Sequence, residues 1–212
     1  MRTPAINDAL VKTLTTQRLQ KYLIASNNNL DNALKLYEEN IKLSESFYTP
    51  LQCVEVCLRN SIHQQLAQTY GNDWSQNGAP GFNADSQSMI GDALFGLAGG
   101  GSPPDSNDVV AELKFAFWVG LLGTHYDSSL WRRCLYRAFP NARRPRRDVH
   151  SRFNAIRRFR NRVMHHEPVY HRPLQQLHDE IIEAIGWMCS DTSAWCAHHS
   201  RFEKVSTNPG GS

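Results

Sequence analysis

The segment from Arg157 to Pro168, RRFRNRVMHHEP, combines the side chains best suited to chemistry in this chain of 212 residues. Arg160 is followed by Asn161 and, five positions later, by His165, with His166 next to it. Histidine titrates near neutral pH, so His165 can act as a general acid or base. Arginine keeps its charge and can bind a phosphate group, and the Asn161 amide can hold the histidine or a phosphate oxygen.

Arg160 is also unusual for its place in the pattern of apolar residues. A spacing of three and four predicts one amphipathic helix that begins at Pro145 and that Pro168 ends. The apolar face consists of Val149, Phe153, Ile156, Phe159, Val163 and Met164. At about 100° per residue, Arg160 falls inside this apolar arc. A core-facing arginine needs an acidic partner, a phosphate or a subunit interface. Glu55, at the edge of another apolar face, is the candidate acid.

The elements around this helix are also predicted to be helical, because no β-alternation of useful length and no internal repeat occurs. Thr15 or Thr16 is predicted to cap a first helix that the turn at 27–29 ends, and a second follows from Leu30 to Ile41. A third is predicted from Thr49 as N-cap, with Pro50 in its first turn and Gln52 in a capping box. Its apolar face is Leu51, Val54, Leu58, Ile62 and Leu66.

The second half is predicted to hold three more helices besides 145–166. One runs from Val109 to Leu122, capped by Asn107 or Asp108, and is apolar nearly all round, as a central buried helix would be. The next is capped by Asp127 or Ser128 and carries Leu130, Trp131, Cys134, Leu135 and Phe139. The last spans Pro173 to Ser190, and a final turn holds Trp195. Helix 145–166 is expected to pack against 109–122, which gives an all-α fold.

Residues 71–108 differ in composition, since eight of the thirteen glycines lie there. This high glycine content predicts a mobile insertion that contains a short helix at 86–97. Residues 1–205 are thus expected to form one domain, followed by a disordered tail, 206–212.

A composition of 41% hydrophobic and 20% charged residues, with no signal-peptide core and no spanning segment, predicts a cytoplasmic protein without a membrane partner. The five cysteines fit reduced thiols, with Cys53 and Cys57 as small buried residues.

The net charge of +3 conceals a strongly basic stretch. Residues 143–172 contain ten arginines against two acids, Asp148 and Glu167. This density suggests a polyanionic partner, because arginine suits phosphate well. The alternative is a solvated basic face without a partner.

Three blocks of sequence carry a resemblance to a known family. The first is the motif itself, RN followed by HHEP, at Arg160-Asn161 and His165 to Pro168. The others are LYEENIKLSESFYTPLQCVEVCLRNSI at 36–62 and ELKFAFWVGLL at 112–122. Together they resemble the HEPN superfamily, and within it the Abi-like branch of bacterial abortive-infection proteins. The resemblance covers about residues 15–190 and implies a HEPN-like helical bundle with extra N-terminal helices and a Gly-rich insertion.

The resemblance implies a metal-independent endoribonuclease that acts as a toxin or phage-defence effector, without a cofactor or metal. A ribose 2′-hydroxyl would attack the adjacent phosphodiester and leave a 2′,3′-cyclic phosphate. The catalytic residues would be Arg160, Asn161 and His165. The expected supporting residues are His166, Glu55, Arg59 and Asn60. The expected RNA-binding residues are Arg143, Arg144, Arg146, Arg147, Arg157, Arg158 and Arg162.

The expected partners are RNA, a second copy of the chain through the 145–168 helix, and an antitoxin, either protein or RNA. Some HEPN toxins carry a modifiable tyrosine two residues after the histidine, where this chain has Glu167. Two other functions stay open. The chain could be a non-catalytic HEPN module that binds RNA or a nucleotide, or a helical interaction protein in which Arg160 is structural, paired with Glu55.

Overall fold

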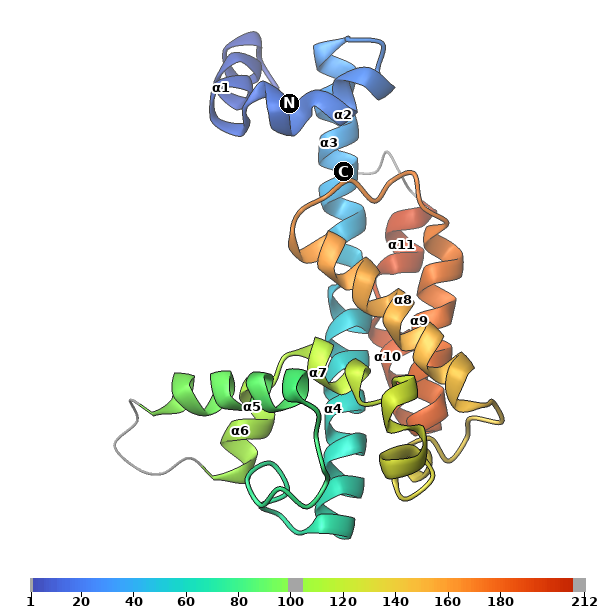
Figure 1. Ribbon diagram of the computed structural model, residues 1–212. Coiled ribbons are helices and arrows are strands. Elements are labelled where there is room, and N and C mark those ends of the chain that lie inside the picture. The colour runs from blue at the N-terminus through green and yellow to red at the C-terminus, as the bar shows by residue number, and fades with distance from the viewer. Residues whose placement is uncertain (1, 99–104, 208–212) are drawn as a thin grey trace.

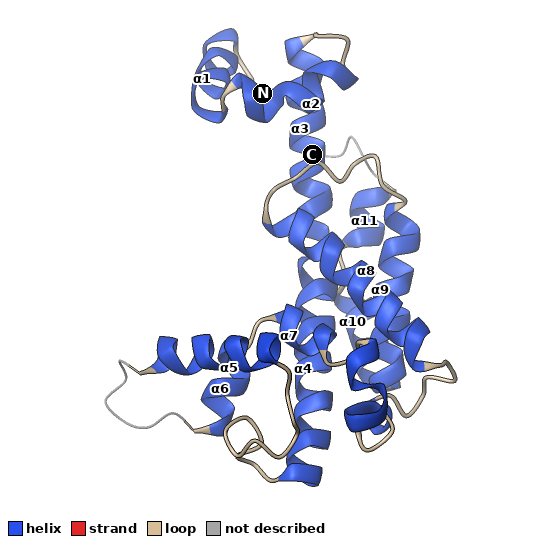
Figure 2. Cartoon of the chain, in the orientation of Figure 1, coloured by secondary structure: helices blue, strands red, loops and turns tan. Residues whose placement is uncertain are grey.

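The computed structural model describes residues 2–98 and 105–207. All regular elements in these two ranges are helices or helical turns, and neither range contains a strand (Figure 2). The predicted all-α fold is therefore confirmed. No helix within these ranges is both long enough and apolar enough to cross a membrane.

Four helices form the N-terminal part: α1 (Pro4–Leu14), α2 (Thr16–Ala25), α3 (Leu30–Ser46) and α4 (Tyr48–Tyr70). Helix α1 was not predicted, although Thr3 caps it by accepting a hydrogen bond from Ile6 N. Helix α2 begins as predicted, with Thr15 as its cap. The two project from one end of the molecule, where α3 begins (Figure 1). Arg2 holds the N-terminus to α3 through ion pairs with Asp31 and Glu38.

The predicted start of α4 is wrong. The helix begins at Tyr48, no side chain caps it, and Phe47 before it already has helical angles (φ −85°, ψ −5°). The Phe47 ring is fully buried against Phe159 and Phe202, with centroids 4.8 and 4.9 Å away. Burial of this ring fixes a helical junction between α3 and α4, so Thr49 lies inside the first turn and cannot cap it. The predicted buried face of α4, from Leu51 to Leu66, is confirmed.

The predicted helix 109–122 is two helices in the structure. The segment contains α6 (Ser106–Glu112) and α7 (Phe115–Gly120), after α5 (Ala84–Leu97). Leu113 and Lys114 between α6 and α7 are extended, with ψ of 123° and 152°. This break lets α6 pack on α5 while α7 packs on α4 and α8. The cap of α6 is Asp105 rather than Asn107 or Asp108, because Asp105 accepts hydrogen bonds from both of their N–H groups.

The segment 71–98 contributes to the core. Trp74 is 1% exposed, and Phe82, Ile90 and Ala93 are also buried. The Trp74 ring packs within about 6 Å of Phe82 and Trp118, with centroids 5.7 and 6.0 Å away. Helix α5 confirms the short helix predicted at 86–97.

The helix predicted from Asp127 or Ser128 is replaced by three short turns: η1 (Thr124–Tyr126), η2 (Asp127–Trp131) and η3 (Leu135–Ala138). Asp127 does not cap a helix, because its carboxylate pairs with Arg132 and Arg146, each at 2.9 Å. Most of the predicted apolar residues are nevertheless buried: Leu130, Cys134, Leu135 and Phe139.

The C-terminal part contains α8 (Arg146–Met164), α9 (Leu174–Met188), α10 (Ser190–His199) and α11 (Phe202–Ser206). Helix α4 is the central element, in contact with α7, α9, α10 and η3 (Figure 1). Helix α8 packs on α7 and α9, which confirms its predicted contact within 109–122. Trp195 lies on the full helix α10, where only a turn was predicted. The predicted disordered tail lies mainly outside the described residues.

Candidate functional site

Arg160 and Glu55 meet where α8 crosses α4. Arg160 Nε lies 3.2 Å from Glu55 Oε2, and their side chains are 32% and 28% exposed. The predicted ion pair between Arg160 and Glu55 is therefore present in the structure. The two Nη groups of Arg160 have no protein hydrogen-bond partner among the described residues. Arg160 lies at the edge of the core rather than inside it, and its outer N–H groups are free to bind an anion.

The C-terminus of α8 is a Schellman turn that fixes both histidines. His165 is still bonded as in a helix, with its N–H donating to Asn161 O at 2.9 Å. His166 adopts a left-handed conformation (φ +56°) and donates to Val163 O at 3.0 Å. Glu167 N then donates to Arg162 O at 2.9 Å, and the two side chains form an ion pair at 2.8 Å. Such a turn satisfies the last carbonyl groups and leaves both histidine rings exposed.

The chain after this turn is held by Asn40 of α3, which was not predicted as a site residue. Asn40 is 3% exposed. Its Oδ1 accepts hydrogen bonds from Val169 N at 2.6 Å and from Tyr170 N at 3.2 Å. The available signal was a polar side chain on the apolar face of α3, seven residues after Ala33. Asn40 thus anchors the segment that positions His165 and His166.

Arg160 and His165 of one chain do not converge. They are separated by about 140° around the helix and by about 7.5 Å along its axis. The helix stays regular up to His165, since the left-handed residue comes only afterwards. Asn161 and Met164 occupy the arc between them. Within the described ranges, neither Asn161 nor His165 has a side-chain hydrogen bond that links it to Arg160.

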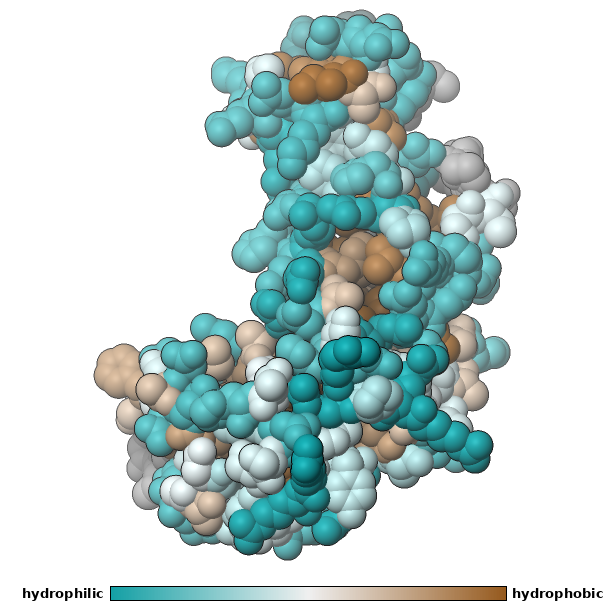
Figure 3. All heavy atoms as spheres, turned by 45° about the vertical axis from the view of Figure 1, so that its right-hand side comes forward, coloured by the Kyte–Doolittle hydropathy of each residue, from teal (hydrophilic) through white to brown (hydrophobic). Residues whose placement is uncertain are grey.

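A groove of about 690 Å³ lies beside the end of α8. The groove is lined by Thr13 and Leu14 of α1, by Arg18 of α2 and by residues of α3. Tyr48 of α4 and the end of α8, with Met164 and His166, complete the lining. Ile41, Tyr48 and Met164 expose 48%, 60% and 39% of their surface here, although Ile41 was predicted to face the core. In Figure 3, brown apolar surface appears at the projecting end of the molecule and again in the middle of the same face.

The other expected supporting residues do not reach Arg160 among the described contacts. Arg59 Nε donates to Asn60 Oδ1 at 3.2 Å, so these two bond each other. His63, one turn further along α4, accepts a hydrogen bond from Trp74 Nε1 at 3.0 Å. Burial, and then the nearby charge of Arg59, lowers the pKa of His63. His63 therefore has a structural role in holding Trp74.

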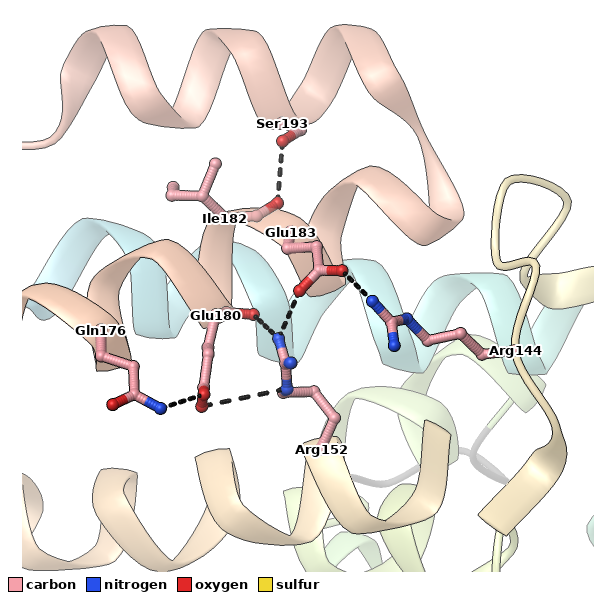
Figure 4. Close-up of polar contacts among 7 residues, drawn as sticks. All are labelled: Arg144, Arg152, Gln176, Glu180, Ile182, Glu183 and Ser193. Carbon is pink, nitrogen blue, oxygen red and sulfur yellow. Dashed lines mark hydrogen bonds and ion pairs between the residues drawn. The ribbon is translucent and has the colours of Figure 1, made fainter. Parts of the chain in front are cut away.

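Several of the arginines expected to bind RNA are already engaged. Arg146 is only 12% exposed and bonds Asp127 and the Leu122 carbonyl. Figure 4 shows Arg144 and Arg152 both directed at Glu183 of α9, with nitrogen–oxygen distances of 2.9 and 2.7 Å. The Arg152 contact ties α8 to α9. Burial raises the pKa of Glu183, but the hydrogen bonds and charges of Arg152 and Arg144 outweigh it, so the pKa is lowered.

The other arginines expected to bind RNA differ in how far they are engaged by neighbouring side chains. Arg157 donates to Asn154 Oδ1, and Arg162 pairs with Glu167. Arg147 is 86% exposed, with only a 3.5 Å contact to its neighbour Asp148. Arg143 and Arg158 are exposed, without an ion pair among the described contacts. The free basic charge is thus smaller than the sequence suggests.

Three cysteines gather between α4 and α10, a cluster that the sequence did not indicate. Cys53 and Cys57 are half-buried, and their Sγ atoms are 4.0 Å apart. Hydrogen bonding to Cys196 and then to Cys57 lowers the pKa of Cys53. The same thiol contacts raise the pKa of Cys57 and of Cys196. Cys196 is far away in sequence, so the spacing of the other two could not reveal it.

Comparison with known proteins found no match: no family model, no curated protein and no solved structure matches the chain. The HEPN-like assignment therefore stays a prediction from the motif.

Proposed function

We propose that the chain is a metal-independent endoribonuclease that acts as a homodimer. The observation that carries this proposal is the setting of Arg160. Glu55 engages its Nε and fixes the side chain, while neither Nη group bonds any of the described residues at this partly exposed edge. A guanidinium held in this way offers two donors in fixed geometry to the oxygens of a phosphodiester.

The proposed reaction needs two proton transfers. The ribose 2′-oxygen loses its proton and bonds to the adjacent phosphorus, the P–O5′ bond breaks, and the 5′-oxygen gains a proton. The products are a 2′,3′-cyclic phosphate and a 5′-hydroxyl. Arg160 would offset the charge that develops on the non-bridging oxygens, and exposed His165 would transfer a proton. Asn161, on the arc between them, would orient the phosphate or the imidazole.

Two copies explain why Arg160 and His165 of one chain point in different directions. A single imidazole cannot easily serve as base on one oxygen and acid on the other. A second copy packed along residues 145–168 would bring its own His165 toward Arg160 of the first. The exposed apolar side chains of Ile41, Tyr48 and Met164 beside this helix fit such a self-contact.

RNA binding would rest on the exposed arginines that have at most a weak ion pair among the described residues. Arg143, Arg147 and Arg158 are exposed, and all three lie on α8 or directly before it. The role as a cytoplasmic toxin or phage-defence effector, and the antitoxin that would restrain it, rest on the motif resemblance alone.

A second candidate is a non-catalytic module that binds RNA or a nucleotide. The separation of Arg160 from His165 favours it, because the arginine alone suffices to hold a phosphate. In that case His165 and His166 would contribute binding surface and no proton transfer.

The deciding experiment is cleavage of RNA by the purified chain in EDTA, with analysis of the product ends. His165→Ala should lower the rate by about 10²- to 10⁴-fold, the usual effect of losing a general acid or base. The matched control is His198→Ala, at an exposed position on α10. Cleavage at the wild-type rate by His165→Ala, or loss of cleavage in EDTA, would refute the metal-independent reaction through His165. RNA binding by the wild type without any cleavage would establish the binding module instead.

A mixing experiment tests the shared site. Arg160→Ala and His165→Ala chains would each be inactive alone. A heterodimer of the two keeps one intact Arg160 and one intact His165 on opposite subunits. Cleavage restored by mixing means that one Arg160 and one His165 act across the interface and that a single imidazole suffices. An inactive mixture of confirmed heterodimers means that both imidazoles are required or that the two residues do not act across the interface, and the first case predicts that a heterodimer of wild type and His165→Ala is inactive as well.

A further inference from the structure

A second group of chemically competent side chains lies where α9 meets α11, apart from the Arg160 site. His178 and Asp179 belong to α9, and Glu203 belongs to α11. One ligand atom from each of the three lies within 4.8 Å of the other two. Among the described residues, no lysine or arginine forms an ion pair with Asp179 or Glu203.

His178 is buried and oriented from several sides. Its side chain is 6% exposed, and its ring stacks on Phe202 with centroids 4.8 Å apart. Phe47 contacts the ring edge-on at 6.2 Å, and Ser200 Oγ lies 2.8 Å from Nε2. These contacts leave the ring little freedom to turn.

Among the described residues, the other ring nitrogen of His178 has no hydrogen-bond partner. Nδ1 is fully buried, and its nearest acidic atom, Asp179 Oδ1, is 3.6 Å away, which is too far for a hydrogen bond. Buried nitrogen atoms are rarely left in this state. When Nε2–H donates to Ser200 Oγ, Nδ1 keeps its lone pair and directs it toward the carboxylates.

Gln175 shows that the two carboxylates converge on one point. Its Nε2 donates to Asp179 Oδ1 at 3.1 Å and to Glu203 Oε1 at 3.2 Å. The positive end of an amide dipole thus lies between two like charges, in a position that a cation would fill more strongly.

We propose that His178 Nδ1, Asp179 and Glu203 bind a divalent transition-metal ion of the Zn²⁺ type. An imidazole ligand favours Zn²⁺ over Mg²⁺ or Ca²⁺, which prefer oxygen ligands alone. Ligands about 2.0–2.1 Å from a tetrahedral ion lie roughly 3.4 Å apart, close to the observed 3.6 Å. The exposed carboxylates supply the remaining adjustment, and water or Gln175 Oε1 would complete the shell.

The interaction between Nε2 and Ser200 Oγ is of the kind that metal-binding histidines use to fix their ring and tautomer. The ion would clamp α11 to α9 and keep Phe202 seated over the His178 ring. This role is structural and is independent of the proposed nuclease, which needs no metal.

The test is titration of the full chain with Co²⁺ and Zn²⁺ after removal of metal. One Co²⁺ should bind per chain and give d–d absorption without a thiolate charge-transfer band, since no cysteine is a ligand. Asp179→Asn and Glu203→Gln should each weaken affinity by at least about tenfold, the smallest usual loss for even an outer-shell partner. Both side chains are exposed, so these variants should fold. Asp92→Asn, the same change at an exposed position on α5, should bind as the wild type does.

Zn²⁺ should also raise the melting temperature of the wild type and of Asp92→Asn, but not of the two ligand variants. No binding to the wild type, or unchanged affinity in both ligand variants, would overturn the proposal. A strong thiolate band would do so as well, because it would place the ion at cysteine ligands instead of His178, Asp179 and Glu203.

Discussion

Replacement of Asn40 by alanine should destabilise the protein without touching the proposed chemistry directly. Among the described residues, the Oδ1 atom of Asn40 is the only acceptor for Val169 N, at 2.6 Å, and it also accepts from Tyr170 N at 3.2 Å. Val169 is fully buried, so its N–H cannot turn to water after the change. A buried donor left without a partner costs about 1–3 kcal/mol.

The second lost bond should cost less, because Tyr170 is half-buried and its N–H can reach solvent. Together the two bonds predict that Asn40→Ala lowers the free energy of unfolding by about 2–4 kcal/mol. Urea denaturation measures this directly, and the slope should stay that of the wild type. Asn60→Ala, on the exposed side of α4, should change stability by less than about 0.5 kcal/mol. A loss below about 1 kcal/mol in Asn40→Ala would mean that the segment after α8 is not anchored by Asn40.

Three further predictions concern the site and its surroundings. Glu55→Ala should lower cleavage by about 10²-fold because Arg160 loses its positioning partner; the unfolding free energy should fall by no more than about 1 kcal/mol, since the pair is partly exposed. His166→Gly should raise stability by about 1 kcal/mol in urea denaturation, because only glycine adopts φ +56° without cost. Burial lowers the pKa of His63 from 6.5, so the unfolded chain binds a proton more readily. The contribution of His63 to the free energy of unfolding should therefore be complete above pH 6.5 and decrease as the pH falls below it. His63→Gln, which can still accept the hydrogen bond from Trp74, should show a smaller decrease of the unfolding free energy over this pH range.

Each of these has a clear contrary result. A Glu55→Ala enzyme that keeps full activity would separate the ion pair from catalysis. A His166→Gly protein less stable than the wild type would reveal contacts of the imidazole that outweigh its backbone strain. An unchanged pH profile in His63→Gln would assign the acid sensitivity to other groups.

The sequence predicted well wherever one helix face is buried along its whole length. The buried faces of α4 and α8 follow directly from apolar spacing, because these faces pack against the core, apart from Met164 at the exposed end of α8. The Arg160–Glu55 pair was predictable for a related reason. Arg160 and Glu55 each lie at the edge of a buried helix face. When the faces of α8 and α4 pack next to each other, the two charges come into contact.

The failures have equally specific causes. The segment 109–122 is apolar nearly all round, so its apolar residues do not define one helix face. A change in the direction of such a face, which could have indicated the extended break at Leu113, therefore cannot be recognised. The signals for a cap at Thr49 are local, and burial of Phe47 against residues far along the chain overrides them. Asn40 and His178 depend on such distant partners too. Their roles appear only when α3 meets the segment after α8, or when α11 covers α9.

Helix α1 has a further consequence for the groove beside His166. It contributes to the lining of that groove, yet none of its own residues is buried. Segments with so few buried contacts open locally at a free energy well below that of global unfolding. Arg160 and Glu55 lie instead between α4 and α8, whose apolar faces are buried in the core. A ligand in the groove would contact a helix that opens easily. Its binding should slow hydrogen exchange in α1 and leave hydrogen exchange in α4 unchanged.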